Sequence, residues 1–210
     1  VTVALHDGTA LVAAESAVDA RRHGELLAPA IRAVLAAAGA TVADLTDVAV
    51  GVGPGPYTGL RAGLVTARVL GSARGMPVHG ACTLDIIAWE AAASAADAGW
   101  AGQAGFTVAT DARRKEVYWA RYAADGSRLT DPAVGAPADA AGGGPVAGEG
   151  GLLYPAELPG PIGPRYPSAA TLACLTAARL AGGEPMLPAE PLYLRRPDAK
   201  VPGPPKRVTP

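Results

Sequence analysis

The stretch Gly53-Pro-Gly-Pro-Tyr-Thr-Gly-Leu-Arg61 decides how this chain folds. It follows a short apolar run at 47–52, which is typical of a buried parallel strand. It precedes a segment with helical spacing that reaches to about residue 73, for which Thr58 is the expected N-cap. Pro54 and Pro56 lack backbone N–H groups, so the loop is a poor phosphate cradle. Strand, tight loop and helix therefore predict one α/β unit joined by a rigid turn.

Segments on both sides of this unit predict two α/β lobes. Before it we expect a two-stranded hairpin around Asp7-Gly8 and a helix over 20–38. After it we expect a strand over 77–81 and a helix over 83–96. The later segments predict a second hairpin from strands 106–110 and 116–122, strand-like pieces at 146–147 and 152–154, and a helix over 168–180. We predict a first lobe at 1–98, a smaller, degenerate second lobe at 99–196 and a disordered tail at 197–210.

Composition limits the classes of function. The chain has 210 residues, half of them hydrophobic, and a formal net charge of -1, so it is globular and has no basic footprint for tight binding of nucleic acid. No uncharged stretch approaches the roughly 18 residues of a membrane-spanning helix, so no membrane association is expected. The two cysteines, Cys82 and Cys174, form no CxxC pair and indicate reduced thiols in a cytoplasmic protein.

The motifs of common enzymes are not found. The sequence has no G-x-S-x-G elbow, and Gly59-Leu60-Arg61 does not complete a Walker A loop. The three histidines, His6, His23 and His79, stand in no H-x-x-H or H-x-x-x-H pair. We therefore predict no catalytic residue, no metal site and no cofactor of its own.

A ridge of small residues marks the helix after the loop. Gly59, Gly63, Ala67, Gly71 and Gly75 recur every four residues. A glycine inside a helix costs about 1 kcal/mol relative to alanine, so such a ridge indicates a close approach by another element. That element is either the chain's own sheet or the helix of a partner.

Four segments, in order, resemble one family over roughly residues 1–196. The loop at 53–61 is similar to the GPGSFTGLR loop of bacterial TsaB (YeaZ) proteins, with Pro56 for Ser and Tyr57 for Phe. Asp-Ala-Arg-Arg-Lys-Glu-Val-Tyr-Trp-Ala at 111–120 resembles the family's DAR..EVYWA hairpin. The segments at 22–27 and 191–195 resemble its HSE-LLP and P.YLR patterns.

The resemblance implies a two-lobe actin-like (ASKHA) fold, each lobe built on an RNase H-like mixed sheet. It also implies a strand before the first hairpin, which this sequence does not contain. That strand would lie between the hairpin and the strand at 48–52, so we expect two unpaired edges.

The resemblance further implies a non-catalytic subunit of the complex that makes N6-threonylcarbamoyladenosine next to the anticodon of tRNA. The implied partners are a TsaD-type transferase, a TsaE-type ATPase and a second copy of the chain. ATP and metal are expected on the partner subunits, and tRNA is expected only through the complex.

We expect three groups of site residues. The partner interface is predicted on the helices at 20–38 and 58–73 and comprises His23, Leu27, Ile31, Gly59, Leu60, Gly63, Leu64, Ala67 and Gly71. The motif loop comprises Gly53, Pro54, Gly55, Tyr57, Thr58 and Arg61. The second-lobe motif comprises Asp111, Arg113, Glu116 and Tyr118, which on its own is an exposed turn with weak ion pairs.

Two other functions remain open from the sequence. One is a stand-alone enzyme, either a glycoprotease-like peptidase or a nucleotide-binding relative of the kinases. The other is a homodimer with no role beside a TsaD-type protein.

Overall fold

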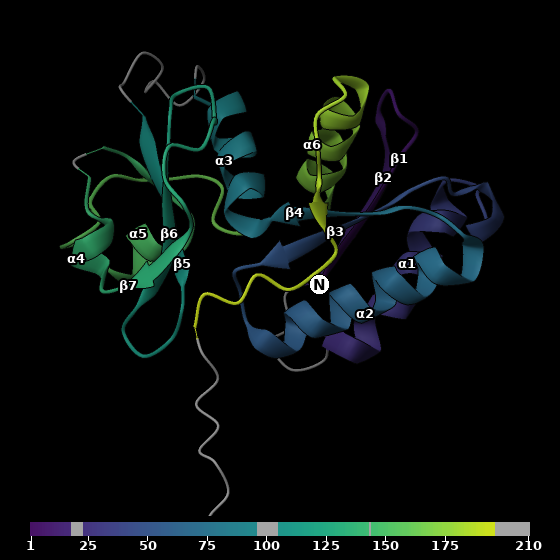
Figure 1. Ribbon diagram of the computed structural model, residues 1–210, viewed down its shortest axis with the longest axis horizontal. Helices are drawn as coiled ribbons and strands as arrows, with labels where there is room; N and C mark the ends of the chain where they lie inside the picture. The colour runs from purple at the N-terminus through teal and green to yellow at the C-terminus, as the bar shows by residue number, and fades with distance from the viewer. Residues whose placement is uncertain (18–22, 96–104, 143, 196–210) are drawn as a thin grey trace, which may run out of the picture.

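The computed structural model describes residues 1–17, 23–95, 105–142 and 144–195. Figure 1 shows two lobes side by side, with the chain crossing between them more than once. The predicted tail at 197–210 lies outside the described residues, as do the start of the expected helix at 20–38 and most of the expected lobe boundary near 99–105. No helix in the described ranges is both long and apolar enough to span a membrane.

The first lobe carries strands between two helical layers. Strands β1 (Thr2–His6) and β2 (Leu11–Ser16) form an antiparallel hairpin. Strand β3 (Val48–Gly53) pairs in parallel with β4 (Val78–Cys82), and β10 (Leu187–Pro188) adds an antiparallel edge to β4. Helices α1 (His23–Ala37) and α2 (Tyr57–Arg74) pack on one side of the strands, and α6 (Ala169–Ala181) packs against β1 and β3. A short 3₁₀ helix, η1, spans Val42–Asp44.

The second lobe has a five-stranded mixed sheet in the order β7-β6-β5-β8-β9. Its strands are β5 (Phe106–Asp111), β6 (Val117–Tyr122), β7 (Ala133–Gly135), β8 (Val146–Ala147) and β9 (Pro161–Ile162). Strands β5, β6 and β7 are antiparallel, whereas β5, β8 and β9 run parallel, which is the mixed sheet that the resemblance implied.

Short helices fill the rest of the second lobe. Helix α4 spans Pro137–Ala140 and α5 spans Gly150–Leu153. The predicted strand-like piece at 146–147 is confirmed as β8, but the one at 152–154 is wrong. There the backbone N–H groups of Leu153 and Tyr154 donate to the carbonyls of Glu149 and Gly150, which makes a helical turn. An apolar run of three residues is too short for periodicity to separate a strand from such a turn.

The lobes do not divide where the sequence suggested. Helix α3 (Thr83–Ala93) falls within 1–98, yet Leu84, Ile87 and Ala88 pack into one core with β5 and β6. Conversely, α6 and β10 fall within 99–196 and pack on the first lobe. A cut at residue 98 would therefore separate elements that share a core.

The expected unpaired edges are present. Within the described residues β1 pairs with β2 alone, and β3 pairs with β4 alone. Both edges line one cavity of about 870 Å³, which is partly open to solvent and is also lined by residues of α1, α2 and α6. This cavity separates the hairpin from the three-stranded sheet.

Candidate functional site

The ridge of small residues on α2 faces the chain's own strands. A Cβ atom on Gly71 would lie 2.3 Å from Cγ2 of Val78, and one on Gly63 would lie 3.8 Å from Cγ2 of Val50. Leu64, Ala67 and Gly71 are buried. The interpretation of this ridge as a docking stripe is therefore corrected: the small, apolar face of an amphipathic helix covers the sheet beneath it.

The other predicted interface residues whose side chains are described also lie on the sides of α1 and α2 that face the strands. Most of them line the cavity between the helices and the strands, namely Leu27, Ile31, Gly59, Leu60, Gly63 and Ala67. The side chain of His23 lies outside the described residues. The residues that the sequence assigned to a partner interface on these two helices therefore lie mostly on the inner faces of the helices.

The outer face of α2 carries two apolar side chains that sequence reasoning missed. Val65 is 60% exposed and Val69 is 62% exposed. They lie four residues apart, so they are neighbours on one helical face. Exposed Arg61 and Arg68 flank them. The sequence could have indicated this pair, because Val65 and Val69 lie near arginines on the helical face opposite the glycines.

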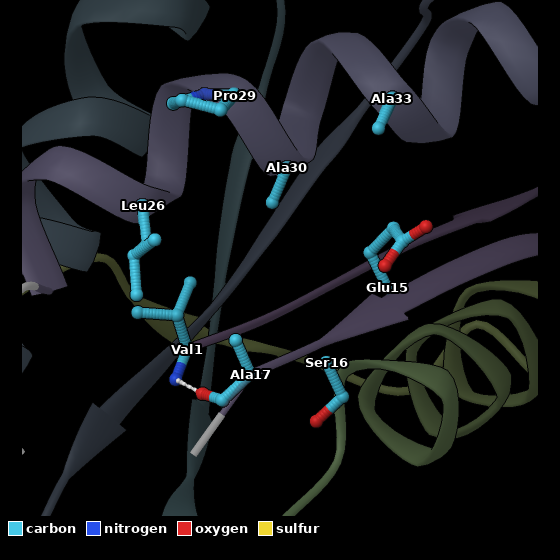
Figure 2. A pocket seen from close by; sticks show the side chains of 8 residues that line it. All are labelled: Val1, Glu15, Ser16, Ala17, Leu26, Pro29, Ala30 and Ala33. Carbon is cyan, nitrogen blue, oxygen red and sulfur yellow. Dashed lines mark hydrogen bonds between the residues drawn. The ribbon is translucent and has the colours of Figure 1, made fainter. Parts of the chain in front are cut away.

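A small pocket lies between α1 and the open end of the β1–β2 hairpin. Figure 2 shows Leu26, Pro29, Ala30 and Ala33 of α1 above the ends of the β1–β2 hairpin. The pocket measures about 260 Å³, and the amino group of Val1 donates to the carbonyl oxygen of Ala17 at 2.7 Å on its floor. Its walls are mostly apolar and bring no cluster of reactive groups together.

The motif loop ends in a stack of exposed rings. The rings of Tyr57 and Tyr193 are stacked with centroids 5.6 Å apart, and both are about half exposed. The guanidinium of Arg61 lies 4.0 Å from the centre of the Tyr57 ring, and its Nε donates to the Tyr193 hydroxyl at 3.2 Å. That hydrogen bond raises the pKa of Arg61. Thr58 is not the N-cap, because α2 begins one residue earlier, at Tyr57.

The extended segment at 191–195 joins the motif loop to the second lobe. The N–H of Leu192 donates to the carbonyl of Val52 at 2.8 Å. Gly53 has φ +98°, which disfavours any other residue, and little space for a side chain, since a Cβ there would lie 3.3 Å from the carbonyl oxygen of Leu192. Arg195 pairs with Glu116 and donates to the carbonyl of Ala112 at 3.1 Å. Three motifs that are distant in sequence thus meet.

The second-lobe motif forms the turn between β5 and β6. Oδ1 of Asp111 accepts from the N–H of Arg113 at 2.7 Å, and Oδ2 lies 3.0 Å from Nη1 of the same residue. Tyr118 is partly buried on β6, and this burial raises its pKa. The expected exposed turn with ion pairs is what the structure shows.

A buried carboxylate that the sequence did not single out lies where α3 meets β6. Asp85 accepts a hydrogen bond from the Tyr122 hydroxyl at 2.8 Å, and Arg128 and Arg179 lie 3.4 and 3.8 Å from it. Its contacts with these three partners, Tyr122, Arg128 and Arg179, give Asp85 a structural role. Across the part of the chain that is described, no three potential metal ligands lie close enough to hold an ion.

Comparison with known proteins finds relatives by sequence. The family model "TsaD: tRNA N6-adenosine threonylcarbamoyltransferase" matches residues 15–163. An uncharacterized protein of Mycobacterium tuberculosis is 46% identical over 184 residues, which cover 87% of this chain and 80% of that protein. The Escherichia coli tRNA threonylcarbamoyladenosine biosynthesis protein TsaB is 34% identical over 122 residues, or 57% of this chain and 48% of TsaB.

The fold is also shared with a solved structure. A Pseudomonas aeruginosa protein, described as similar to peptidase YEAZ, superposes with a TM-score of 0.77 at 29% identity. The match covers 92% of this chain and 94% of that one. The two-lobe α/β fold predicted from the sequence is confirmed.

Proposed function

The chain belongs to the TsaB (YeaZ) family, which the TsaD family model recognises, and we propose that it serves tRNA threonylcarbamoyladenosine synthesis as a non-catalytic subunit. In this proposal it binds a TsaD-type transferase and supports the modification of the adenosine next to the anticodon. ATP and metal belong to the partner subunits. A TsaE-type ATPase and a second copy of the chain are further proposed partners.

The observation that carries the proposal is the exposed pair Val65 and Val69 on α2. Apolar side chains that remain in water beside arginines match the composition of the centre of a protein interface. Helix α1 packs beside α2, so a partner's helices could contact both at once. The family model that matches this chain is named for the transferase itself. A TsaD-type protein is therefore a partner of related sequence, which supports pairing through corresponding helices.

The test is to mix the chain with the TsaD-type protein of the same organism. We expect a Val65→Asp/Val69→Asp variant to weaken the heterodimer at least tenfold, because two charges would be buried in an apolar contact. Leu129→Asp is the matched control, since Leu129 is 61% exposed on the second lobe. Sedimentation measures the pairing, and threonylcarbamoyl transfer to tRNA measures the consequence.

Other results would favour the alternatives. Equal pairing and equal transfer with both variants would contradict the α2 interface. Micromolar binding of ATP with metal by the chain alone, measured by calorimetry, would favour a nucleotide-binding enzyme. Self-association that is lost in the valine variant, with no pairing to the transferase, would favour the homodimer.

A further inference from the structure

We propose that the turn between β5 and β6 binds the phosphate backbone of the tRNA that the assembled complex modifies. The turn consists of Arg113, Arg114 and Lys115 and is called here the basic turn. The inference deepens the proposed function and rests on it, because it assigns to this chain a contact with the tRNA that was expected only through the partner.

The backbone of the basic turn is in the left-handed region at three consecutive residues. Arg113, Arg114 and Lys115 have φ of 62°, 57° and 61°. Residues other than glycine and asparagine adopt this conformation only at a cost in conformational free energy. Glycine would meet the same geometry at little cost. The chain instead places three cationic side chains at the tip of a hairpin.

Hydrogen bonds on both sides of the basic turn hold this conformation. The N–H of Ala112 donates to the carbonyl of Glu116, and the N–H of Glu116 donates to the carbonyl of Arg113, both at 3.0 Å. Asp111 accepts from the N–H of Arg113. None of these backbone bonds needs a cationic side chain at 113 or 115. The Arg113 guanidinium also pairs with Asp111, but it stays open to solvent and can contact a second anion. The Arg113 side chain is 77% exposed.

The carboxylates around the basic turn are matched by arginines. Asp111 pairs with Arg113, Glu116 with Arg195, and Glu149 with Arg165 at 2.5 Å. Lys115, an exposed cation, adds a positive charge to this balanced group. The local excess is therefore positive although the whole chain carries a net charge of -1. Guanidinium groups on a fixed backbone suit the oxygens of phosphate, and a row of cations suits a polyanion.

Exposed aromatic rings extend the basic turn toward the first lobe. The stacked rings of Tyr57 and Tyr193, with Arg61 against them, connect through the segment at 191–195 to Arg195. Figure 1 shows this segment running between the start of α2 and the loop that joins β5 to β6. Aromatic rings beside cations are a common surface for unpaired nucleotides. This combination favours RNA over an acidic protein surface.

The experiment measures tRNA binding by the heterodimer as salt increases. An Arg113→Gln/Lys115→Gln variant is compared with Arg74→Gln, whose exposed arginine lies at the opposite end of α2. We expect the double variant to pair normally with the TsaD-type protein but to bind unmodified tRNA about tenfold more weakly. The slope of log affinity against log salt should fall by about 1 to 2, as expected for the loss of two phosphate contacts.

A charge-preserving variant separates charge from folding. Arg113→Lys/Lys115→Arg should bind tRNA as the unaltered chain does. If it loses affinity to the same extent as the glutamine variant, the basic turn is structural and the inference is overturned. Unchanged affinity and slope in the glutamine variant, or an equal loss in Arg74→Gln, would overturn it as well. Weaker pairing with unchanged tRNA binding would assign the turn to a protein partner and overturn the RNA contact.

Failure of the proposed function is distinguishable from failure of this inference. If the unaltered chain does not pair with the TsaD-type protein, the proposed function fails. The same variants are then compared for tRNA binding by the chain alone at low salt. The glutamine variant should still bind more weakly there, and equal binding would reject the basic turn.

Discussion

At the scale of single residues, buried polar groups hold the contact between α3 and the second sheet. Asp85 is satisfied by the Tyr122 hydroxyl and by two arginines. Burial and the nearby Asp85 carboxylate both raise the pKa of Tyr122, so the phenol stays protonated and donates. Burial likewise raises the pKa of the Cys82 thiol to about 11, so the thiol stays protonated and is a poor nucleophile at neutral pH.

We predict that Tyr122→Phe destabilises the protein by about 1–3 kcal/mol, because Asp85 loses its shortest hydrogen bond while it stays buried. Urea unfolding measures the change. Tyr118→Phe is the matched control on the same strand, where the side chain is only partly buried, and it should change the free energy of unfolding by less than about 0.5 kcal/mol. Equal effects of the two substitutions would show that the bond to Asp85 adds no stability.

At the scale of elements, the glycines of α2 fix how closely the helix approaches the sheet. Gly71 is in contact with the Val78 side chain, whereas a Cβ on Gly63 would make an ordinary contact with Val50. Two glycines of the same ridge therefore have different surroundings: Gly71 is tightly packed, and Gly63 has room for a methyl group. Only the position of β4 against the last turns of the helix makes one glycine indispensable.

We predict opposite effects for alanine at these two positions. Gly63→Ala should stabilise the protein by up to about 1 kcal/mol, because alanine favours the helix and the space is available. Gly71→Ala should destabilise it by about 1–3 kcal/mol, because the new methyl group overlaps Val78. Thermal unfolding of both variants decides the matter. A destabilising Gly63→Ala would mean that the ridge is closer to the sheet than the structure shows.

At the scale of the whole molecule, the chain crosses between the lobes and returns. Helix α3 carries it into the second lobe, and α6 and β10 bring it back to the first. The segment at 191–195 then spans both, through Leu192 on Val52 and Arg195 on Glu116. The lobes are therefore joined by side chains as well as by the covalent chain.

We predict that Arg195 and Glu116 are energetically coupled. Because both side chains are partly exposed, Arg195→Gln and Glu116→Gln should each cost little, and their double-mutant cycle should give about 0.5 kcal/mol. Loss of this link should also speed hydrogen exchange of the Leu192 amide. Strictly additive effects, with unchanged exchange, would mean that the ion pair does not hold the lobes together.

The sequence by itself determined the order of elements, because apolar periodicity, caps and turn residues act over neighbouring residues. It therefore predicted β3, α2, β4, α3 and the β5–β6 hairpin closely, and the motifs indicated the family. The tertiary structure alone decided which face of α2 is buried. A run of glycines reports that something approaches closely, but the identity of that neighbour depends on where β3 and β4 lie.

The same reason explains the other differences. The boundary at residue 98 runs through a shared core, because α3 packs on both lobes: Ile86 joins a core with Leu172 and Leu175 of α6, and Leu84 and Ile87 join a core with β5 and β6. Val65 and Val69 were missed because exposure is a property of the packed molecule. The meeting of Tyr57 with Tyr193, and of Glu116 with Arg195, joins positions too distant in sequence for any local pattern to pair.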